Sequence, residues 1–152
     1  MKVPEVIEWS DDDVSPVVAV VAELQRAGAG WVNLDPAVDP DDAPPPRGGL
    51  GAVLSRRGPD VPRATWVAAA PPDRPSVGIQ HGSGHRAMSL LADFHLAPPA
   101  GLRVIQDNPR RGLVAEVPTD DLTAVLEWLV AAATALSTVT LTGAWRAEIH
   151  RR

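Results

Sequence analysis

The sequence predicts an α+β fold in which an antiparallel or mixed sheet carries helices mainly on one face. Apolar residues make up 45% of the 152 residues, enough for the core of one domain. Segments with the period of two that is typical of strands alternate with segments of helical period. From residue 77 onward the expected order is strand, helix, strand, strand, helix, strand. In that order helices and strands form separate layers.

The first part of the chain predicts a strand–helix–strand unit. A short strand is expected at residues 6–9. Ser15 and Pro16 favour a helix start, because serine caps helices and proline suits the first turn. Valines and a leucine at helical spacing follow until Gly28, and a second strand is expected at residues 31–34. So short a unit cannot form its own core, so we expect it to extend the sheet of the main body.

The main body completes the pattern. Further strands are expected at residues 50–54, 65–70, 77–80, 102–106 and 113–117, with helices at 84–95 and 122–136. Near the C-terminus Trp145, Ala147 and Ile149 alternate with polar residues, which predicts a last strand near a sheet edge. We therefore expect a ferredoxin-like (split β-α-β) two-layer sandwich over residues 1–152 as a single domain.

Residues 35–47 form the one low-complexity segment, rich in proline and aspartate. Proline restricts its neighbours and the aspartates repel one another, which favours an extended chain. We expect a flexible surface loop that separates the N-terminal unit from the main body.

Composition narrows the class of protein. The chain has no cysteine, which excludes disulfides, a thiol nucleophile and cysteine-held metals. The net charge is −5, and residues 1–60 carry eleven acidic and five basic residues. We expect no nucleic-acid partner, because phosphate contacts need a basic face. The bias toward alanine, valine, proline and arginine over lysine is typical of a GC-rich bacterial genome.

The apolar runs, such as residues 129–133, are too short to cross a bilayer. Residues 1–5 lack the basic and apolar regions of a signal peptide. We therefore expect a cytoplasmic protein without membrane contact, and no motif calls for a cofactor.

The strongest candidate site is the strand-to-helix turn at Gly82, Ser83, Gly84, His85 and Arg86. A helix start leaves free backbone N–H groups to which an anion can bind. The other two expected helices begin with acidic residues, as the helix dipole favours, whereas this one begins with basic residues. A bound phosphate or carboxylate would remove that conflict.

A second basic cluster, Arg103, Arg110 and Arg111, flanks an expected hairpin loop. Arginine binds carboxylates and phosphates through two parallel hydrogen bonds. If the fold brings this hairpin beside His85 and Arg86, the two clusters form one anion pocket. A solvated hairpin tip is the alternative.

The residues of the turn match a metal site or a catalytic nucleophile less well than an anion site. His81 and His85 are four residues apart, but glycines between them and the lack of a third nearby ligand argue against a metal site. Ser83 has glycine as both neighbours, not two positions away as in a nucleophile elbow, so it is expected to cap the helix. The strand–Gly82-Ser83-Gly84–helix step is similar to the pyrophosphate loop of acyl-CoA-dependent N-acetyltransferases. The similarity covers only these residues, and the expected strand order departs from that family.

Three functions follow from these observations. The first is a non-catalytic binder of an anionic ligand at Gly82–Arg86. The alternative is a partner-binding protein of the inhibitor, chaperone or immunity type, without a small ligand. The third is a group-transfer enzyme that uses His81 or His85 as a base.

The partner surface would be the acidic N-terminal half or the helix at 122–136, which is apolar nearly all round. Trp128 points away from the stripe centred on Leu126 and Leu129, so we expect it to face a protein partner or a second copy of the chain. Cover by the N-terminal unit is the competing explanation.

Overall fold

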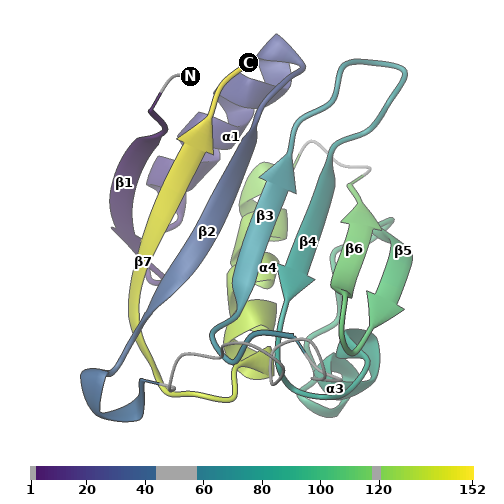
Figure 1. Ribbon diagram of the computed structural model, residues 1–152. Coiled ribbons are helices and arrows are strands. Elements are labelled where there is room, and N and C mark those ends of the chain that lie inside the picture. The colour runs from purple at the N-terminus through teal and green to yellow at the C-terminus, as the bar shows by residue number, and fades with distance from the viewer. Residues whose placement is uncertain (1–2, 44–57, 118–120) are drawn as a thin grey trace.

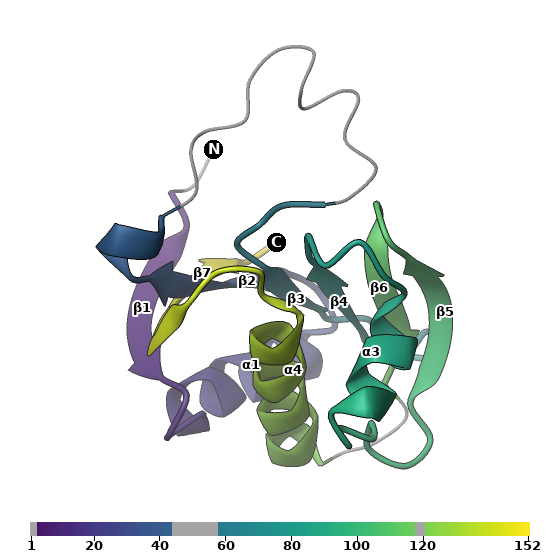
Figure 2. The same cartoon turned by 90° about the horizontal axis from the view of Figure 1, so that it is seen from below.

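The computed structural model describes residues 3–43, 58–117 and 121–152. They form a seven-stranded sheet in the order β1-β7-β2-β3-β4-β6-β5, in which every neighbouring pair is antiparallel. The helices α1, α3 and α4 lie on one face of this sheet (Figure 2). The α+β class is therefore confirmed. The described strands are β1 (Glu5–Ser10), β2 (Trp31–Val38), β3 (Arg63–Val67), β4 (Ser76–Gln80), β5 (Arg103–Asn108), β6 (Gly112–Glu116) and β7 (Leu141–His150).

The helices form where local sequence signals predict them, but Val14, not the predicted Ser15, precedes the first helix, and it makes no side-chain capping hydrogen bond. Helix α1 (Ser15–Ala27) has its proline in the first turn and ends at Gly28, whose φ of 71° is left-handed. Helix α4 (Leu122–Leu136) has the predicted bounds, and Asp121 caps it by accepting a hydrogen bond from the N–H of Ala124 at 3.1 Å. Helix α3 (Ala87–Asp93) is shorter than predicted.

The sheet contains two split β-α-β units, with β3 between them (Figure 1). In one, α3 joins β4 to β5, with β6 between the two strands. In the other, α1 joins β1 to β2, with β7 between them. A ferredoxin-like sheet would place β7 beside β4, but β2 and β3 lie between them. Strand β7 is therefore second from the edge of the sheet, with only β1 outside it, which agrees with the predicted position near a sheet edge.

The prediction of a loop at residues 35–47 is wrong at its start, because β2 continues to Val38. Asp35 and Pro36 continue β2, opposite Arg146 and Trp145 of β7, and the register shifts between Pro36 and Val38. A proline is tolerated in a strand where the ladder is already irregular. A 3-10 turn, η1 (Pro40–Asp42), follows. Residues 44–47 and the strand expected at 50–54 lie outside the described residues.

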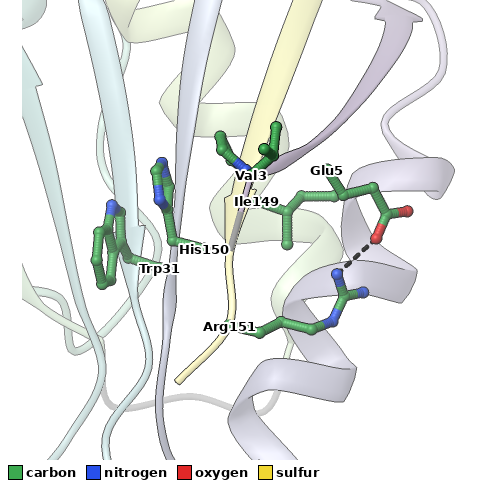
Figure 3. A pocket seen from close by; sticks show the side chains of 7 residues that line it. Val3, Glu5, Trp31, Ile149, His150 and Arg151 are labelled. Atoms are coloured by element: carbon green, nitrogen blue, oxygen red, sulfur yellow. Dashed lines mark hydrogen bonds and ion pairs between the residues drawn. The ribbon is translucent and has the colours of Figure 1, made fainter. Parts of the chain in front are cut away.

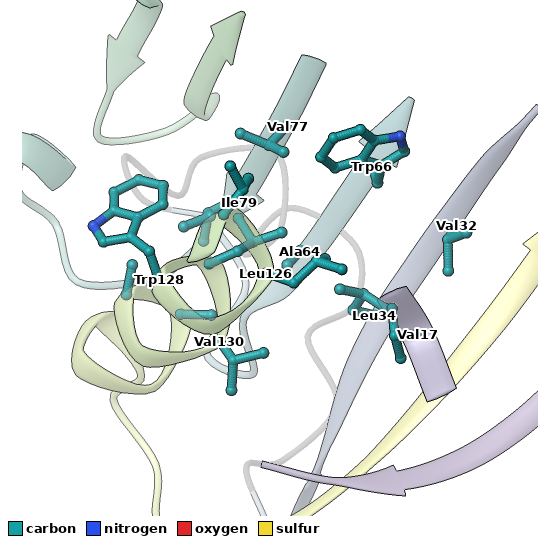
Figure 4. Close-up of a cluster of buried hydrophobic side chains, with 14 of the residues drawn as sticks. Val17, Val32, Leu34, Ala64, Trp66, Val77, Ile79, Leu126, Trp128 and Val130 are labelled. Carbon is teal, nitrogen blue, oxygen red and sulfur yellow. The ribbon is translucent and has the colours of Figure 1, made fainter. Parts of the chain in front are cut away.

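The core lies between the sheet and the helices (Figure 4). Trp66 of β3 is fully buried there, and the buried Val32 and Val77 lie directly opposite it on the neighbouring strands. Successive side chains of a strand point to opposite faces of the sheet, so the alternate residues of these strands lie on the face without helices. The side chains of that second face are considered as a candidate site below.

Candidate functional site

The predicted site, residues 82–86, forms the loop between β4 and α3. Its glycines have local structural roles. A Cβ on Gly82 would lie 2.7 Å from the carbonyl oxygen of Pro59, so glycine is required for the close approach of two backbone segments. Gly84 has a φ of 77°, which only glycine adopts without strain. Neither position therefore needs a phosphate to explain its glycine.

A carboxylate of the chain itself binds the start of α3. Asp107 on β5 accepts hydrogen bonds from the N–H groups of Ala87 at 2.7 Å and Met88 at 3.0 Å. These two N–H groups lie at the helix start where the sequence predicted that an external anion binds. The conflict with the helix dipole is thus resolved within the chain, because Asp107 supplies the negative charge. Ser83 is not the cap: Arg86 precedes the helix, and its side chain makes no capping hydrogen bond.

The three hairpin arginines do not form one cluster at this loop. Arg103 lies at the opposite end of the β5–β6 hairpin from the turn, opposite Glu116, whose carboxylate is 3.8 Å from its guanidinium. Arg110 and Arg111 lie in the turn, where Asn108 Oδ1 accepts hydrogen bonds from both backbone N–H groups. The side chains of His85 and Arg86 are exposed. The structure therefore brings Asp107, not Arg103, to the predicted site.

His81 is fully buried at the end of β4. Its Nδ1 lies 2.9 Å from Ser83 Oγ, while its Nε2 has no hydrogen-bond partner among the described residues. Burial lowers the pKa of His81, partly offset by the charge of Asp107. The Ser83–His81 pair has the spacing of a nucleophile and base, but no described acid orients the ring through Nε2. The geometry thus gives no support to a hydrolytic triad.

Trp128 lies inside the molecule, with 7% of its surface exposed. Its indole N–H donates a hydrogen bond to the carbonyl oxygen of Leu96, 3.2 Å away in the segment after α3. Helix α1 packs on another side of α4. The apolar excess of α4 is thus covered within the chain, which leaves no exposed surface at Trp128 for a partner.

A second candidate site is the sheet face opposite the helices, which no described helix covers (Figure 2). We call it the open face. Its side chains alternate along the strands with the buried ones and lie in cross-strand rows. The open face comprises Val6, Glu8, Trp31, Asn33, Asp35, Arg63, Thr65, Val67, Ser76, Gly78, Gln80, Val114, Glu116, Arg146, Glu148 and His150.

An aromatic stack stands at one end of the open face. The indole of Trp31 and the ring of His150 lie 4.5 Å apart and nearly parallel, at 7°. The guanidinium of Arg152 lies 5.1 Å from the Trp31 ring. A pocket of about 440 Å³ adjoins the stack, between the ends of β1 and β7 (Figure 3). The ion pair between Glu5 and Arg151 borders this pocket.

Charged side chains of the open face are held in pairs. Arg63 forms a two-pronged contact with Asp35, with Nε–Oδ1 at 2.6 Å and Nη2–Oδ2 at 3.1 Å. His150 Nε2 lies 2.6 Å from Glu148 Oε1, and this hydrogen bond lowers the pKa of Glu148. No local sequence pattern identifies this face, because its residues come from strands that pair only in the fold. The alternation of each strand was the available signal.

A small depression lies at the centre of the open face. It has a volume of about 270 Å³, and its lining includes Gly78, Thr65, Arg63, Gln80 and Arg111. Arg111 is the one member of the predicted anion site that contributes to it.

Within the described ranges, no three His, Cys, Asp or Glu side chains gather closely enough to hold a metal ion. None of the described helices combines the length and apolar character that crossing a membrane requires. Comparisons with protein-family models, curated proteins and solved structures find no match to this chain.

Proposed function

We propose that this protein binds another protein through its open face and catalyses no reaction. The observation that carries the proposal is the fixed geometry of this face. The Trp31 ring is stacked on His150, and Arg63 is held in its fork by Asp35. Tryptophan and arginine dominate the energetics of protein interfaces. Side chains that are already ordered lose little conformational entropy when a partner binds.

Apolar and small residues of the open face support the same proposal. Val67 lies directly opposite Trp31 and is 42% exposed. Thr65, Ser76 and Gly78 provide a low centre over which a partner surface can pack closely. Antiparallel sheets can face water on one side, so charged pairs alone would not indicate binding. The ordered indole beside an exposed valine is what distinguishes this face from a merely solvated one.

By analogy with other small acidic bacterial proteins, we include inhibitor, chaperone or immunity roles in the proposal. It also includes a cytoplasmic, bacterial setting. Binding of an anion at Gly82–Arg86 has less support, since Asp107 already holds two N–H groups of α3. A group-transfer role for His81 has less support, since its side chain is buried.

The test uses two variants that introduce the same charge on opposite faces. Val67→Arg places a guanidinium on the open face, and Ala19→Arg places one on the exposed side of α1. Tagged wild-type protein is incubated with an extract of the source cells, and the partner protein that it retains is purified. That partner is then mixed with wild type and with each variant, and complex formation is measured by sedimentation. We expect a stoichiometric complex with wild type and Ala19→Arg, but not with Val67→Arg. Equal complex formation by both variants, or failure of wild type to form a complex, would refute the proposal.

A further inference from the structure

We infer that the depression at Gly78 receives a carboxylate side chain, aspartate or glutamate, of the protein that docks on the open face. The inference rests on the proposed function and names the chemistry of its central contact. Two independent features carry it: a glycine that the backbone does not require, and two arginines in the lining of the depression.

Gly78 has no backbone reason to be glycine. Its φ is not in the positive range, and a Cβ placed on it would meet only the carbonyl oxygen of Leu113, at 3.4 Å. Glycine weakens the interior of a strand, and there it often marks a place where another group approaches closely. Thr65 and Val114 flank Gly78 on the neighbouring strands. The missing side chain thus creates the depression between them.

Arg63 and Arg111 are the charged donors around the depression, while the hydroxyl of Thr65 is already donated to Asn33 Oδ1, 3.2 Å away. Arg111 is exposed, and its guanidinium has no ion-pair partner among the described residues. Arg63 donates two of its five N–H groups to Asp35, which leaves three N–H groups for another acceptor. Gln80 adds a side-chain amide, and no carboxylate lies among the described lining residues. Such a lining complements an anion, and a planar carboxylate matches the fork of an arginine.

The position of the depression selects the source of that carboxylate. The depression, of about 270 Å³, lies at the centre of the open face, where hot-spot contacts of interfaces concentrate. An acidic side chain presented by a docked protein would reach it there.

The first experiment follows backbone and arginine side-chain NMR signals of the full chain during three titrations. N-acetylglutamate N-methylamide supplies the carboxylate, the matching glutamine compound is its neutral control, and inorganic phosphate tests a free anion. We expect saturable shifts at Gly78, Thr65 and Arg111 Nε with the glutamate compound and none with the glutamine compound. Equal shifts with both compounds, or shifts with phosphate alone, would overturn the inference.

Matched variants locate the effect. Gly78→Val fills the depression, while Ser76→Val adds the same side chain two residues away on the same face. Arg111→Glu reverses the free charge, while Arg103→Glu reverses the charge of the Glu116 partner at the far end of the hairpin. We expect the glutamate shifts to be lost in Gly78→Val and Arg111→Glu and kept in the two controls. Because Arg111 is exposed, its variant keeps the test valid even if Gly78→Val folds poorly. Unchanged binding in Arg111→Glu contradicts the inference.

Partner capture separates failure of this inference from failure of the proposed function. If Val67→Arg abolishes the complex while Gly78→Val and Arg111→Glu form it at wild-type affinity, the carboxylate pocket is wrong and docking stands. If Val67→Arg forms the complex at wild-type affinity, the docking surface itself is wrong. Agreement requires at least a tenfold loss of partner affinity in all three variants.

Discussion

Asp107→Ala removes the carboxylate that the structure places at the start of α3. Two hydrogen bonds disappear, those from the N–H groups of Ala87 and Met88. Ala87 is fully buried, so its N–H loses its partner without gaining water, whereas Met88 is only partly buried. A lost helix cap costs about 0.5–2 kcal/mol and an unsatisfied buried donor about 1–3 kcal/mol. These costs overlap, so we expect a loss of about 2 kcal/mol.

Urea unfolding followed by circular dichroism measures this loss. For a chain of this length about 2 kcal/mol lowers the melting temperature by about 4–8 °C. Asp107→Asn keeps one acceptor without the charge, so its loss should be about half as large. Asp93→Ala is the control, because Asp93 is exposed near the other end of the same helix. If Asp107→Ala lies within about 0.5 kcal/mol of wild type, as surface substitutions usually do, the reasoning is refuted.

Three further predictions concern the N–H groups at the start of α3, the buried His81 and the buried Trp128. Inorganic phosphate should raise the melting temperature of Asp107→Ala more than that of wild type, because the vacated N–H groups accept an anion; equal shifts would contradict this. Burial holds the pKa of His81 below its ordinary 6.5, so the unfolded chain takes up the proton first as pH falls. The unfolding free energy should therefore fall from about pH 7 to about pH 5, and His81→Gln but not His85→Gln should flatten that slope in urea titrations. Trp128→Glu should lose several kcal/mol, because it buries a charge and breaks the bond to Leu96; a folded monomer of native stability in sedimentation and circular dichroism would refute this.

Elements with strong local signals could be predicted from the sequence. Helix α4 has a nearly continuous apolar run, and its bounds match the prediction. Helix α1 has a proline at its start and a glycine at its end, and both act as expected. The strand order could not be predicted in the same way. Strand β7 inserts between β1 and β2, an arrangement that depends on pairing between the two ends of the chain.

The candidate site shows the same limit. Basic residues at the start of α3 predicted a bound anionic ligand, whereas the structure places a carboxylate of the chain itself there. The charge comes from Asp107, which no local pattern connects to Ala87 twenty residues earlier. Likewise Gly78 was visible as a glycine in a strand, but its neighbours Thr65 and Val114 lie on other strands. Pairing in three dimensions, not local propensity, creates both features.

The most direct measurement of the central claim is the indole NMR spectrum of the complex. The chain has five tryptophans, and Trp31 is the one on the open face. Trp9, Trp66, Trp128 and Trp145 are at most 7% exposed. If a partner docks on the open face, the N–H signal of Trp31 shifts on complex formation and the other four stay in place. A complex that leaves the Trp31 signal unchanged would contradict the account.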